Sequence, residues 1–537
     1  MNRVGKILKK WISDIFMFDI LREPDYIEVF CEEQEHSADV EVKIIDKKSY
    51  FYLNANGSKP KLVKVRWNYT TKEQVSVLGD AWERAYGDLE WKGLSGERFM
   101  PWYFLASNGK ETVACGAMVG ANSFISFQYD AKGIIAWFDV RNGGSGVELG
   151  NRKLLMGILV CEHYKDCSEF EAAKEFCKAM SPSPLLPKTP VYGSNNWYYA
   201  DGNSSRDDIL NDAKILAELT EGIENRPFMV IDDGWSENNC AGPWNPNKKF
   251  GDMKTLADEM RKVGVKPGIW LRPLHDDDAL LKHPEWGYKP QKGETDEKFL
   301  DPTHPGVKEY LIEVFTKIRN WGYELVKHDF TTFDMFGNFG FSMARVVTPE
   351  ADWNFYDNSK TNAEIVLDLY KLIRETVGDM IIIGCATFSH LSAGIFEVNR
   401  IGDDTSGRYW NRTRILGVNS LAFRLPQNDT FYKVDADCVG MIPDAIDWKL
   451  NKQWLDVLAK SGSPLFVSMH PESLTEEIKL DLKEAFRINA LQQNNAFPLD
   501  WKYNATPSIW NIDGNITEYD FFGEDSFYPL IKERCPY

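Results

Sequence analysis

Apolar and polar positions alternate in short runs near the beginning of the chain, from about residue 43 to residue 160. Stretches such as "VEVKIIDKKSYFYLNANG" and "FISFQYDAKGIIAWFDV" alternate with a period of two and are separated by turns rich in Asn, Asp and Gly. This pattern is typical of antiparallel strands that each bury one face. The sequence therefore predicts an N-terminal antiparallel β-sandwich over residues 1–185.

A proline-rich segment follows the last of these runs. The stretch "CSEFEAAKEFCKAM" has helical periodicity, and "SPSPLLPKTP", residues 181–190, cannot continue a helix because proline lacks the amide hydrogen that a helix requires. Beyond it the pattern becomes an apolar strand, a loop and an amphipathic helix, repeated several times. Helices are predicted at residues 207–219, 253–263, 305–320 and 362–375.

Eight apolar strand candidates occur in this repeating region, which predicts a (β/α)8 barrel over residues 186–475. A doubly wound sheet is the alternative, but it would place a glycine-rich phosphate turn after its first strand, and "SNNWYYADG" is not such a turn. After "ESLTEEIKLDLKEAFRINALQQ" the last forty or so residues return to short aromatic strands, and a small C-terminal β-domain is predicted over residues 476–537. The predicted fold class is multidomain α/β, with a central TIM barrel between the sandwich and this small domain.

Charge narrows the range of partners. The chain of 537 residues carries 62 basic and 80 acidic side chains, which gives a formal net charge of −18. A surface this acidic repels phosphate backbones and anionic lipids, so neither nucleic acid nor a membrane is an expected partner. The charge is compatible with a monomer or an oligomer and leaves the oligomeric state open.

The cysteines and the N-terminal residues bear on the compartment. The nine cysteines form no CxxC pair, which favours free thiols in a reducing compartment. The first apolar run is broken by Lys9, Lys10, Asp14 and Asp19, unlike a signal peptide or a membrane span. We therefore expect a cytoplasmic, bacterial protein; a protein whose secretion signal had been removed, and which is periplasmic or secreted, would have the same sequence features.

Polar residues collect where the predicted barrel strands end. In barrel enzymes the chemistry takes place at the carboxyl ends of the strands, because the loops open there. One charged residue at a strand end is ordinary, but polar or charged residues at the ends of six successive strands, most of them carboxylates, indicate a functional site. From the second strand to the seventh, these residues are Asp232 and Asp233; Trp270 and Arg272; Lys327 and Asp329; Cys385; Arg400, Asp403 and Asp404; and Asp435 and Asp437.

This set of side chains favours a neutral polyol over a metal or a phosphate. Carboxylates accept hydrogen bonds from vicinal hydroxyls, indoles pack on the C–H face of a sugar ring, and no His/Cys ligand set accompanies them. No metal and no cofactor is therefore expected. Glycoside cleavage requires two carboxyl groups, one ionised and one protonated.

The stretch "YELVKHDF" places a cation beside a carboxylate. Strand alternation puts Lys327 and Asp329 on one face and His328 on the other. The ammonium of Lys327 would keep Asp329 ionised, as a nucleophile requires. In "RIGDDT", two adjacent acids leave open whether Asp403 or Asp404 donates the proton.

Several of these motifs together resemble a known enzyme family. The set "IDDGW", "KPGIWLRP", "VKHDF", "GCATF", "NRIGDDTSGRYW" and "VDADC" is similar to the α-galactosidases of glycoside hydrolase family 36 in their short bacterial form, and more distantly to family 27 of the same clan D. The resemblance covers about residues 190–470. It implies that Asp329 is the nucleophile and that Asp404, rather than Asp403, is the acid/base.

The resemblance also implies a set of sugar contacts. Asp232 and Asp233 would bind the O4 and O6 side of the sugar. The chain departs from the family in "GCATFSHLSAG", in Arg272 and in the acidic run 276–278, so an N-acetylgalactosaminide or another galacto-configured glycoside is an alternative substrate. The remaining implied contacts are Lys327, Arg400, Trp197, Trp270, Cys385 and Asp437.

The function that follows is a retaining exo-glycoside hydrolase that releases terminal α-linked galactose from a small oligosaccharide or other α-galactoside. Its double displacement predicts carboxyl groups about 5 to 5.5 Å apart. Two alternatives are an α-galactosyl transglycosylase, in which an acceptor sugar replaces water, and a catalytically silent carbohydrate-binding protein. A sugar-phosphate enzyme is disfavoured because no glycine-rich or basic phosphate cup follows the last strands.

Overall fold

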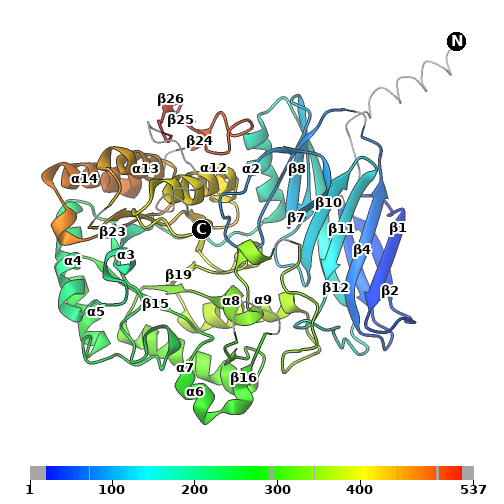
Figure 1. Ribbon diagram of the computed structural model, residues 1–537, viewed down its shortest axis with the longest axis horizontal. Helices are drawn as coiled ribbons and strands as arrows, with labels where there is room; N and C mark the ends of the chain where they lie inside the picture. Colours follow the sequence, from blue (N-terminus) through cyan, green and yellow to red (C-terminus); the bar gives the residue numbers. More distant parts are fainter. Residues whose placement is uncertain are drawn as a thin grey trace. The chain divides into compact units, whose positions relative to one another are not determined.

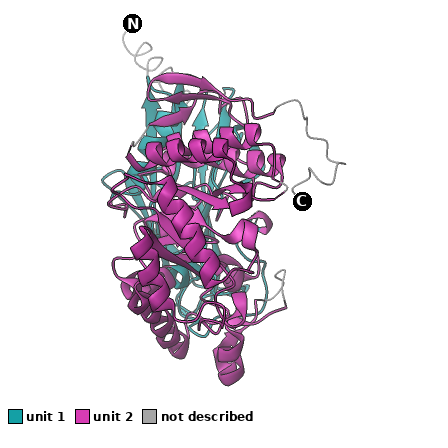
Figure 2. Cartoon of the chain, turned by 90° about the vertical axis from the view of Figure 1, so that its left-hand side faces the viewer, with its two compact units in different colours: residues 1–82, 90–182, 343–366 teal, residues 83–89, 183–342, 367–537 magenta. Residues whose placement is uncertain are grey.

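The computed structural model describes residues 20–71, 73–290, 296–343, 345–443, 445–491 and 495–522. The chain divides into two compact units, which Figure 2 draws in different colours. Unit 1 consists of residues up to Trp82, Glu90–Pro182 and Met343–Val366, and unit 2 consists of Glu83–Leu89, Ser183–Ser342 and the residues from Leu367 onward.

Unit 1 contains two antiparallel sheets, as the alternating pattern predicts (Figure 1). One has the strand order β1-β4-β11-β10-β7 and the other β2-β3-β12-β9-β8-β5-β6. The strands are β1 (Tyr26–Cys31), β2 (Asp39–Ile45), β3 (Lys48–Asn54), β4 (Pro60–Asn68), β5 (Ser76–Gly79), β6 (Lys92–Gly93), β7 (Ser95–Pro101), β8 (Tyr103–Ser107), β9 (Glu111–Ala117), β10 (Phe124–Asp130), β11 (Gly133–Asp139) and β12 (Leu154–Lys165).

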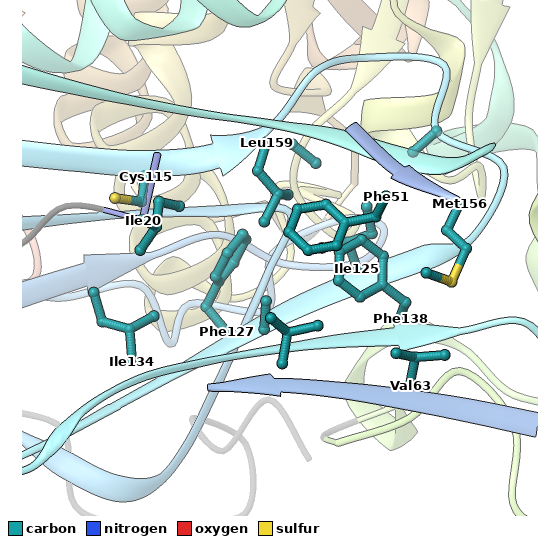
Figure 3. Packing of buried hydrophobic residues seen from close by; sticks show 14 of the residues in the cluster. Ile20, Phe51, Val63, Cys115, Ile125, Phe127, Ile134, Phe138, Met156 and Leu159 are labelled. Carbon is teal, nitrogen blue, oxygen red and sulfur yellow. The ribbon is translucent and has the colours of Figure 1, made fainter. Parts of the chain in front are cut away.

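The core of unit 1 lies between these sheets. In β3 every second residue is buried, which directs Phe51 inward. Its ring meets Phe138 of the other sheet with ring centroids 5.0 Å apart, and Ile125 lies beside them (Figure 3). Burying a side chain of this size contributes about 1.5–3 kcal/mol. The predicted helix after the sandwich is α2 (Glu169–Met180), which begins with a capping box at Ser168.

Unit 2 is built on a parallel sheet that closes into a barrel. The sheet order is β21-β20-β19-β18-β15-β14-β13-β23-β22. β21 pairs with β20, and β22 pairs with β23. β21 and β22 are the two halves of one barrel strand, which is interrupted at Asp437, whose φ is 75°. The strands are β13 (Tyr192–Asn195), β14 (Phe228–Ile231), β15 (Lys266–Leu271), β18 (Leu325–His328), β19 (Ile381–Gly384), β20 (Val398–Arg400), β21 (Lys433–Asp435), β22 (Cys438–Met441) and β23 (Leu465–Met469).

Long helices follow the strands and confirm the predicted alternation. Ser205 caps α4 with a capping box, and His304 caps α7 by accepting from Gly306 N. α4 packs on β14 and α5 on β15. The helices are α4 (Arg206–Leu219), α5 (Met253–Val263), α7 (Pro305–Trp321), α9 (Asn362–Val377), α13 (Trp448–Lys460) and α14 (Glu476–Leu491).

The loops at the carboxyl ends of the barrel strands carry short elements of their own. Between β20 and β21 these include a π-helical stretch, Thr413–Asn419. The others are α3 (Trp197–Ala200), α6 (Asp277–Lys282), β16 (Gly287–Tyr288), β17 (Phe299–Leu300), α8 (Thr331–Phe336), α10 (Ser389–Ser392), α11 (Trp410–Arg412) and α12 (Ser420–Arg424).

The chain ends its described part in a small antiparallel sheet of β24 (Ala496–Pro498), β25 (Ile509–Ile512) and β26 (Asn515–Glu518). The sandwich, barrel and C-terminal strands confirm the predicted fold class, while the domain boundaries at 185 and 475 stay predictions. Of the helices that the structure describes, none has the length and apolar composition needed to cross a membrane.

Candidate active site

Asp329 directly follows β18, at the carboxyl end of the barrel. Its Oδ1 accepts hydrogen bonds from the backbone amides of Phe330, at 2.7 Å, and Ala386, at 3.1 Å. Its Oδ2 accepts from the indole Nε1 of Trp270, at 3.2 Å. Three donors from three parts of the barrel therefore fix the carboxylate in one orientation.

The surroundings keep Asp329 ionised. Burial by itself would raise the pKa of this carboxyl, but the charges of Lys327 and Arg84, together with the Trp270 and Ala386 hydrogen bonds, lower the pKa to about 2. Lys327 acts on Asp329 through its charge, while its Nζ lies 2.8 Å from Oδ2 of Asp232. At neutral pH Asp329 is a carboxylate.

His328 lies on the opposite face of β18, as strand alternation predicts. Its ring is completely buried and packs against Phe396, with centroids 5.0 Å apart, and Tyr370, at 6.0 Å. Burial lowers the pKa of His328 to about 4, so the ring is neutral. It contributes to packing behind the site.

Asp404 follows β20 and lines an open cavity of about 400 Å³. Its side chain is 39% exposed, and its Oδ1 lies 2.9 Å from Nη2 of Arg400 and 3.8 Å from Nη1 of Arg84. Burial raises the pKa of Asp404, but these two guanidinium groups outweigh it and lower the pKa, while the charge of Asp329 raises it. The other cavity residues are Trp197, Tyr198, Asp201, Ser406, Arg408, Tyr409 and Arg412.

Asp403 is held differently from its neighbour. Its Oδ2 lies 2.8 Å from Arg412 Nη2 and its Oδ1 lies 3.4 Å from Arg84 Nη1, and its side chain is 16% exposed. Asp403 is not among the residues that line the cavity, whereas Asp404 is. Of the two adjacent acids that the sequence leaves open, the geometry favours Asp404 as the one that can reach a bound molecule.

Arg400 is the centre of a buried network behind Asp404. Its Nη2 lies 2.7 Å from Oδ2 of Asp437, and its Nη1 lies 3.8 Å from Sγ of Cys385. Asp437 also accepts from the hydroxyl of Tyr198 and from Thr405 N at 2.6 Å. Arg400, Asp437 and Cys385 are all nearly inaccessible to solvent, and their contacts described above are with each other and with neighbouring protein groups.

Asp232 and Asp233 follow β14 and have different environments. Asp232 is buried and accepts from Asn195 Nδ2 at 2.5 Å and from Lys327. Asp233 is half-buried and accepts from Gly234 N at 2.7 Å. Burial raises the pKa of Asp233 to about 6, so this carboxyl exchanges its proton near neutral pH.

The tryptophans divide between the site and the packing around it. Trp197 begins α3, is half-buried and lines the cavity beside Asp404, and Trp270 is buried against Asp329. Trp235 is fully buried and packs against Trp244, with ring centroids 6.0 Å apart.

Arg272, a departure from the family motif, is occupied by a structural partner. Its Nη2 and Nε both donate to Asp334 in α8, with an Nη2 distance of 2.7 Å. The guanidinium also lies over the ring of Phe330, 4.4 Å from its centroid. Because Phe330 is the residue after Asp329, this contact supports the loop that presents the carboxylate.

Comparisons with known proteins agree with this architecture. No protein-family model matches the chain. A stretch of 156 residues is 29% identical to the bifunctional α-galactosidase/sucrose kinase AgaSK of Mediterraneibacter gnavus, a match that spans 26% of this chain and only 16% of that relative.

Solved structures match over most of the chain. The α-galactosidase of Thermus thermophilus is 15% identical with a TM-score of 0.62, over 90% of this chain and 99% of that one. The family 36 α-galactosidase AgaA of Geobacillus stearothermophilus is 14% identical with a TM-score of 0.59, over 86% and 69%. The galactosidase domain of AgaSK is 15% identical with a TM-score of 0.57, over 91% and 74%.

The fold is that of the family 36 α-galactosidases. At these identities the likeness concerns the fold, which confirms the architecture that the family motifs imply. The roles that the family resemblance gives to individual residues stay predictions.

Three residues near the carboxylates are absent from the sequence prediction. Arg84 reaches Asp403 and Asp404 from the segment Glu83–Leu89 of unit 2, and Tyr198 and Asn195 donate to Asp437 and Asp232. Asn195 and Tyr198 lie in "SNNWYY", at the end of the first barrel strand, where strand-end position is a usable signal. Arg84 lies outside the barrel sequence, and no local pattern marks it.

Across the described ranges, no group of three or more His, Cys, Asp or Glu side chains has an arrangement that could hold a metal ion.

Proposed function

We propose that this protein is a retaining exo-α-galactosidase that releases terminal α-linked galactose. The observation that carries the proposal is the pairing of a fixed, ionised carboxylate, Asp329, with a second carboxyl, Asp404, that lines a cavity and responds to the charge of the first. Two carboxyl groups in separate electrostatic environments are what glycoside cleavage requires.

In the first step, Asp329 attacks the anomeric carbon while protonated Asp404 gives its proton to the glycosidic oxygen. The bond from the anomeric carbon to that oxygen breaks, the alcohol leaves, and a β-galactosyl ester of Asp329 forms. In the second step, Asp404 takes a proton from water, the water oxygen attacks the anomeric carbon, and Asp329 is released. Two inversions restore the α configuration.

The electrostatics of the pair suit this exchange of roles. In the free enzyme, Arg400 and Arg84 lower the pKa of Asp404 overall, while burial and the negative charge of Asp329 act in the opposite direction, towards the proton that the first step needs. Once Asp329 is an ester, that charge is lost, and Arg400 and Arg84 remain to favour the carboxylate form of Asp404. Asp404 is then the base that the second step needs.

The sugar would be held by residues around Asp329. Asp233 has an accessible carboxyl at the barrel end and would accept from hydroxyls on the O4 and O6 side, with Asp232 and Lys327 beside it. Trp270 and Trp197 would lie against the C–H faces of the substrate. Arg400, Cys385 and Asp437 complete the proposed set of contacts. Arg400 also holds Asp404 in place, and Cys385 and Asp437 contact Arg400 from behind.

The substrate class rests on the family motifs and on the related structures. The Thermus thermophilus enzyme was solved with p-nitrophenyl α-D-galactopyranoside and with stachyose. By analogy, we propose α-galactosides, including small oligosaccharides, as substrates of this chain. An N-acetylgalactosaminide is the second candidate, because the loops containing Ala386 and Asp276 differ from the family pattern.

The first experiment is the release of nitrophenol from 4-nitrophenyl α-D-galactopyranoside by the wild type and by D329A. We expect D329A to lose on the order of 10³-fold or more of kcat, since it lacks the nucleophile. D403N, which changes a carboxyl outside the cavity, is the matched control and should keep far more activity. A D329A enzyme that keeps most of its activity would contradict the proposal. In a separate assay with an added acceptor sugar, galactosylated products would identify transglycosylation.

A further inference from the structure

A short segment that precedes the barrel in sequence is fixed beside the acid/base in unit 2. Ala85 N donates to Ile401 O at 2.7 Å, and Ala85 forms a parallel β-bridge with Gly402, just before the Asp403–Asp404 pair. On the other side of Arg84, the carbonyl of Glu83 accepts from Arg424 Nη1 at 2.7 Å. These contacts anchor the backbone immediately before and after Arg84.

The side chain of Arg84 is directed at the carboxyl pair. It is 7% exposed, and one nitrogen, Nη1, lies 3.4 Å from Asp403 Oδ1 and 3.8 Å from Asp404 Oδ1. Its Nε lies 3.0 Å from Glu83 Oε1, and its guanidinium lies 5.7 Å from the ring centroid of Tyr86. The anchored segment thus delivers a buried positive charge to the loop after β20.

We propose that Arg84 is a positioning residue that holds Asp404 in its ionised form during the second step of the reaction. This proposal rests on the proposed function, in which Asp404 alternates between acid and base.

Both cations near Asp404 approach the same oxygen. Arg400 and Arg84 contact Oδ1, and within the part of the chain that the structure describes, Oδ2 makes no hydrogen bond. Oδ2 is therefore the atom available to exchange a proton in the cavity. A guanidinium on Oδ1 stabilises the carboxylate without occupying the atom that carries the proton.

Other charged or titratable groups also face Asp404 and its neighbours. Arg400 and Asp437 lie behind it, Lys327 acts from β18 and Asp329 from the position just after β18, and Arg412 donates to its carbonyl oxygen at 2.9 Å. Arg400 already shares its charge with Asp437. Arg84 shares its charge with Glu83 and Asp403 instead, so the two cations that reach Asp404 have different sets of partners. The further groups around the pair are Asp403, Tyr198, Cys385, Glu83, Tyr86, Asp201 and Arg408.

The test is the pH dependence of kcat with 2,4-dinitrophenyl α-D-galactopyranoside. Its leaving group needs no proton, so the second step limits kcat, and the acid limb reports the pKa of Asp404 in the galactosyl-enzyme. We expect R84Q to move this limb to higher pH by about one unit, the effect of losing a cation at this range. R84K, which keeps the charge, should superimpose on the wild type.

A structural role for Arg84 would give a different result. In that case R84Q would lower kcat at every pH without moving the limb, or R84K would move it as far as R84Q does; either outcome overturns the proposal. If circular dichroism shows that R84Q is unfolded, R84M, which keeps the hydrocarbon packing on Tyr86, replaces it and carries the same expectation.

A second readout separates this proposal from the proposed function. The ¹³C carboxyl resonance of Asp404, assigned by its loss in D404N, is titrated in the wild type and in R84Q. A higher midpoint in R84Q supports the role of Arg84 even if the wild type cleaves no galactoside. An unchanged midpoint overturns it even if the enzyme is active.

Discussion

The ammonium of Lys327 lies 2.8 Å from Oδ2 of Asp232, and the two side chains are 13% and 4% exposed. They come from strands separated by β15, so the pair crosses the interior of the barrel at its carboxyl end. The same ammonium lowers the pKa of Asp329. One cation thus neutralises a sugar-binding candidate and keeps the candidate nucleophile charged.

Replacing Lys327 should therefore harm both stability and catalysis. K327M leaves Asp232 buried without its cation, which costs about 3 kcal/mol of unfolding free energy. It also raises the pKa of Asp329, so the acid limb of kcat/KM should move to higher pH. Urea unfolding and a pH profile measure the two effects. A variant with wild-type stability and an unmoved limb would contradict this account.

Asp404 and Asp403 should respond differently to the leaving group. D404N removes the proton donor, so hydrolysis of an alkyl galactoside should fall far more than hydrolysis of the dinitrophenyl galactoside, whose leaving group needs no proton. D403N should lower both rates by similar factors. The ratio of kcat/KM for the two substrates distinguishes the two variants. A larger change of this ratio in D403N than in D404N would assign the acid/base to Asp403.

Asp233 should make stability and sugar binding depend on pH. Its pKa in the folded state is raised from 3.8 to about 6, so the folded protein favours the protonated form and loses stability relative to D233N as pH rises through this range. D233N should therefore melt at a higher temperature than the wild type at pH 7, and the difference should vanish below pH 3.8. Calorimetry at the two pH values tests this. Equal melting temperatures at pH 7 would show that Asp233 has its ordinary pKa.

The same carboxyl should also affect KM. A carboxylate accepts from sugar hydroxyls more strongly than a protonated carboxyl does, so KM should increase as pH falls below about 6. D233N should have a high KM with little pH dependence in this range. Steady-state kinetics with 4-nitrophenyl α-D-galactopyranoside measure both.

The core of unit 1 offers a prediction that does not depend on the site. Phe51 is completely buried between the two sheets, and F51A should destabilise the protein by about 3–5 kcal/mol. Y26A is the control, because Tyr26 is 49% exposed on an edge strand and should change stability by less than about 0.5 kcal/mol. Comparable losses in both variants would mean that the packing of Phe51 is not what stabilises the sandwich.

Local patterns predicted much of the fold. The helix expected at 253–263 has those bounds in α5, because Asp252 caps its start and Gly264 adopts a left-handed conformation at its end. The carboxyl-end residues of the strands could be predicted because a parallel barrel brings all of these ends to one face. Position alone therefore marked Asp329, Asp232 and the Asp403–Asp404 pair as candidates, and the choice of Asp404 came from the family resemblance.

Features that depend on contacts between residues far apart in the sequence could not be predicted from these local patterns. The interruption of the seventh strand at Asp437 depends on a backbone conformation that the Arg400 and Thr405 contacts stabilise, and no residue type requires it. Arg84 reaches Asp404 through tertiary contacts of its anchored segment, which leave no periodic signal. The partners of Arg272 likewise become clear only when α8 is in place.

The most direct test of the central claim is to trap the covalent intermediate. The wild type is incubated with a fluorinated galactosyl substrate that forms the glycosyl-enzyme faster than water releases it, and the labelled peptide is identified by mass spectrometry. The account predicts one galactosyl ester, on Asp329. A label on another carboxyl, or hydrolysis that proceeds with β-galactose as the first product and without any label, would contradict it.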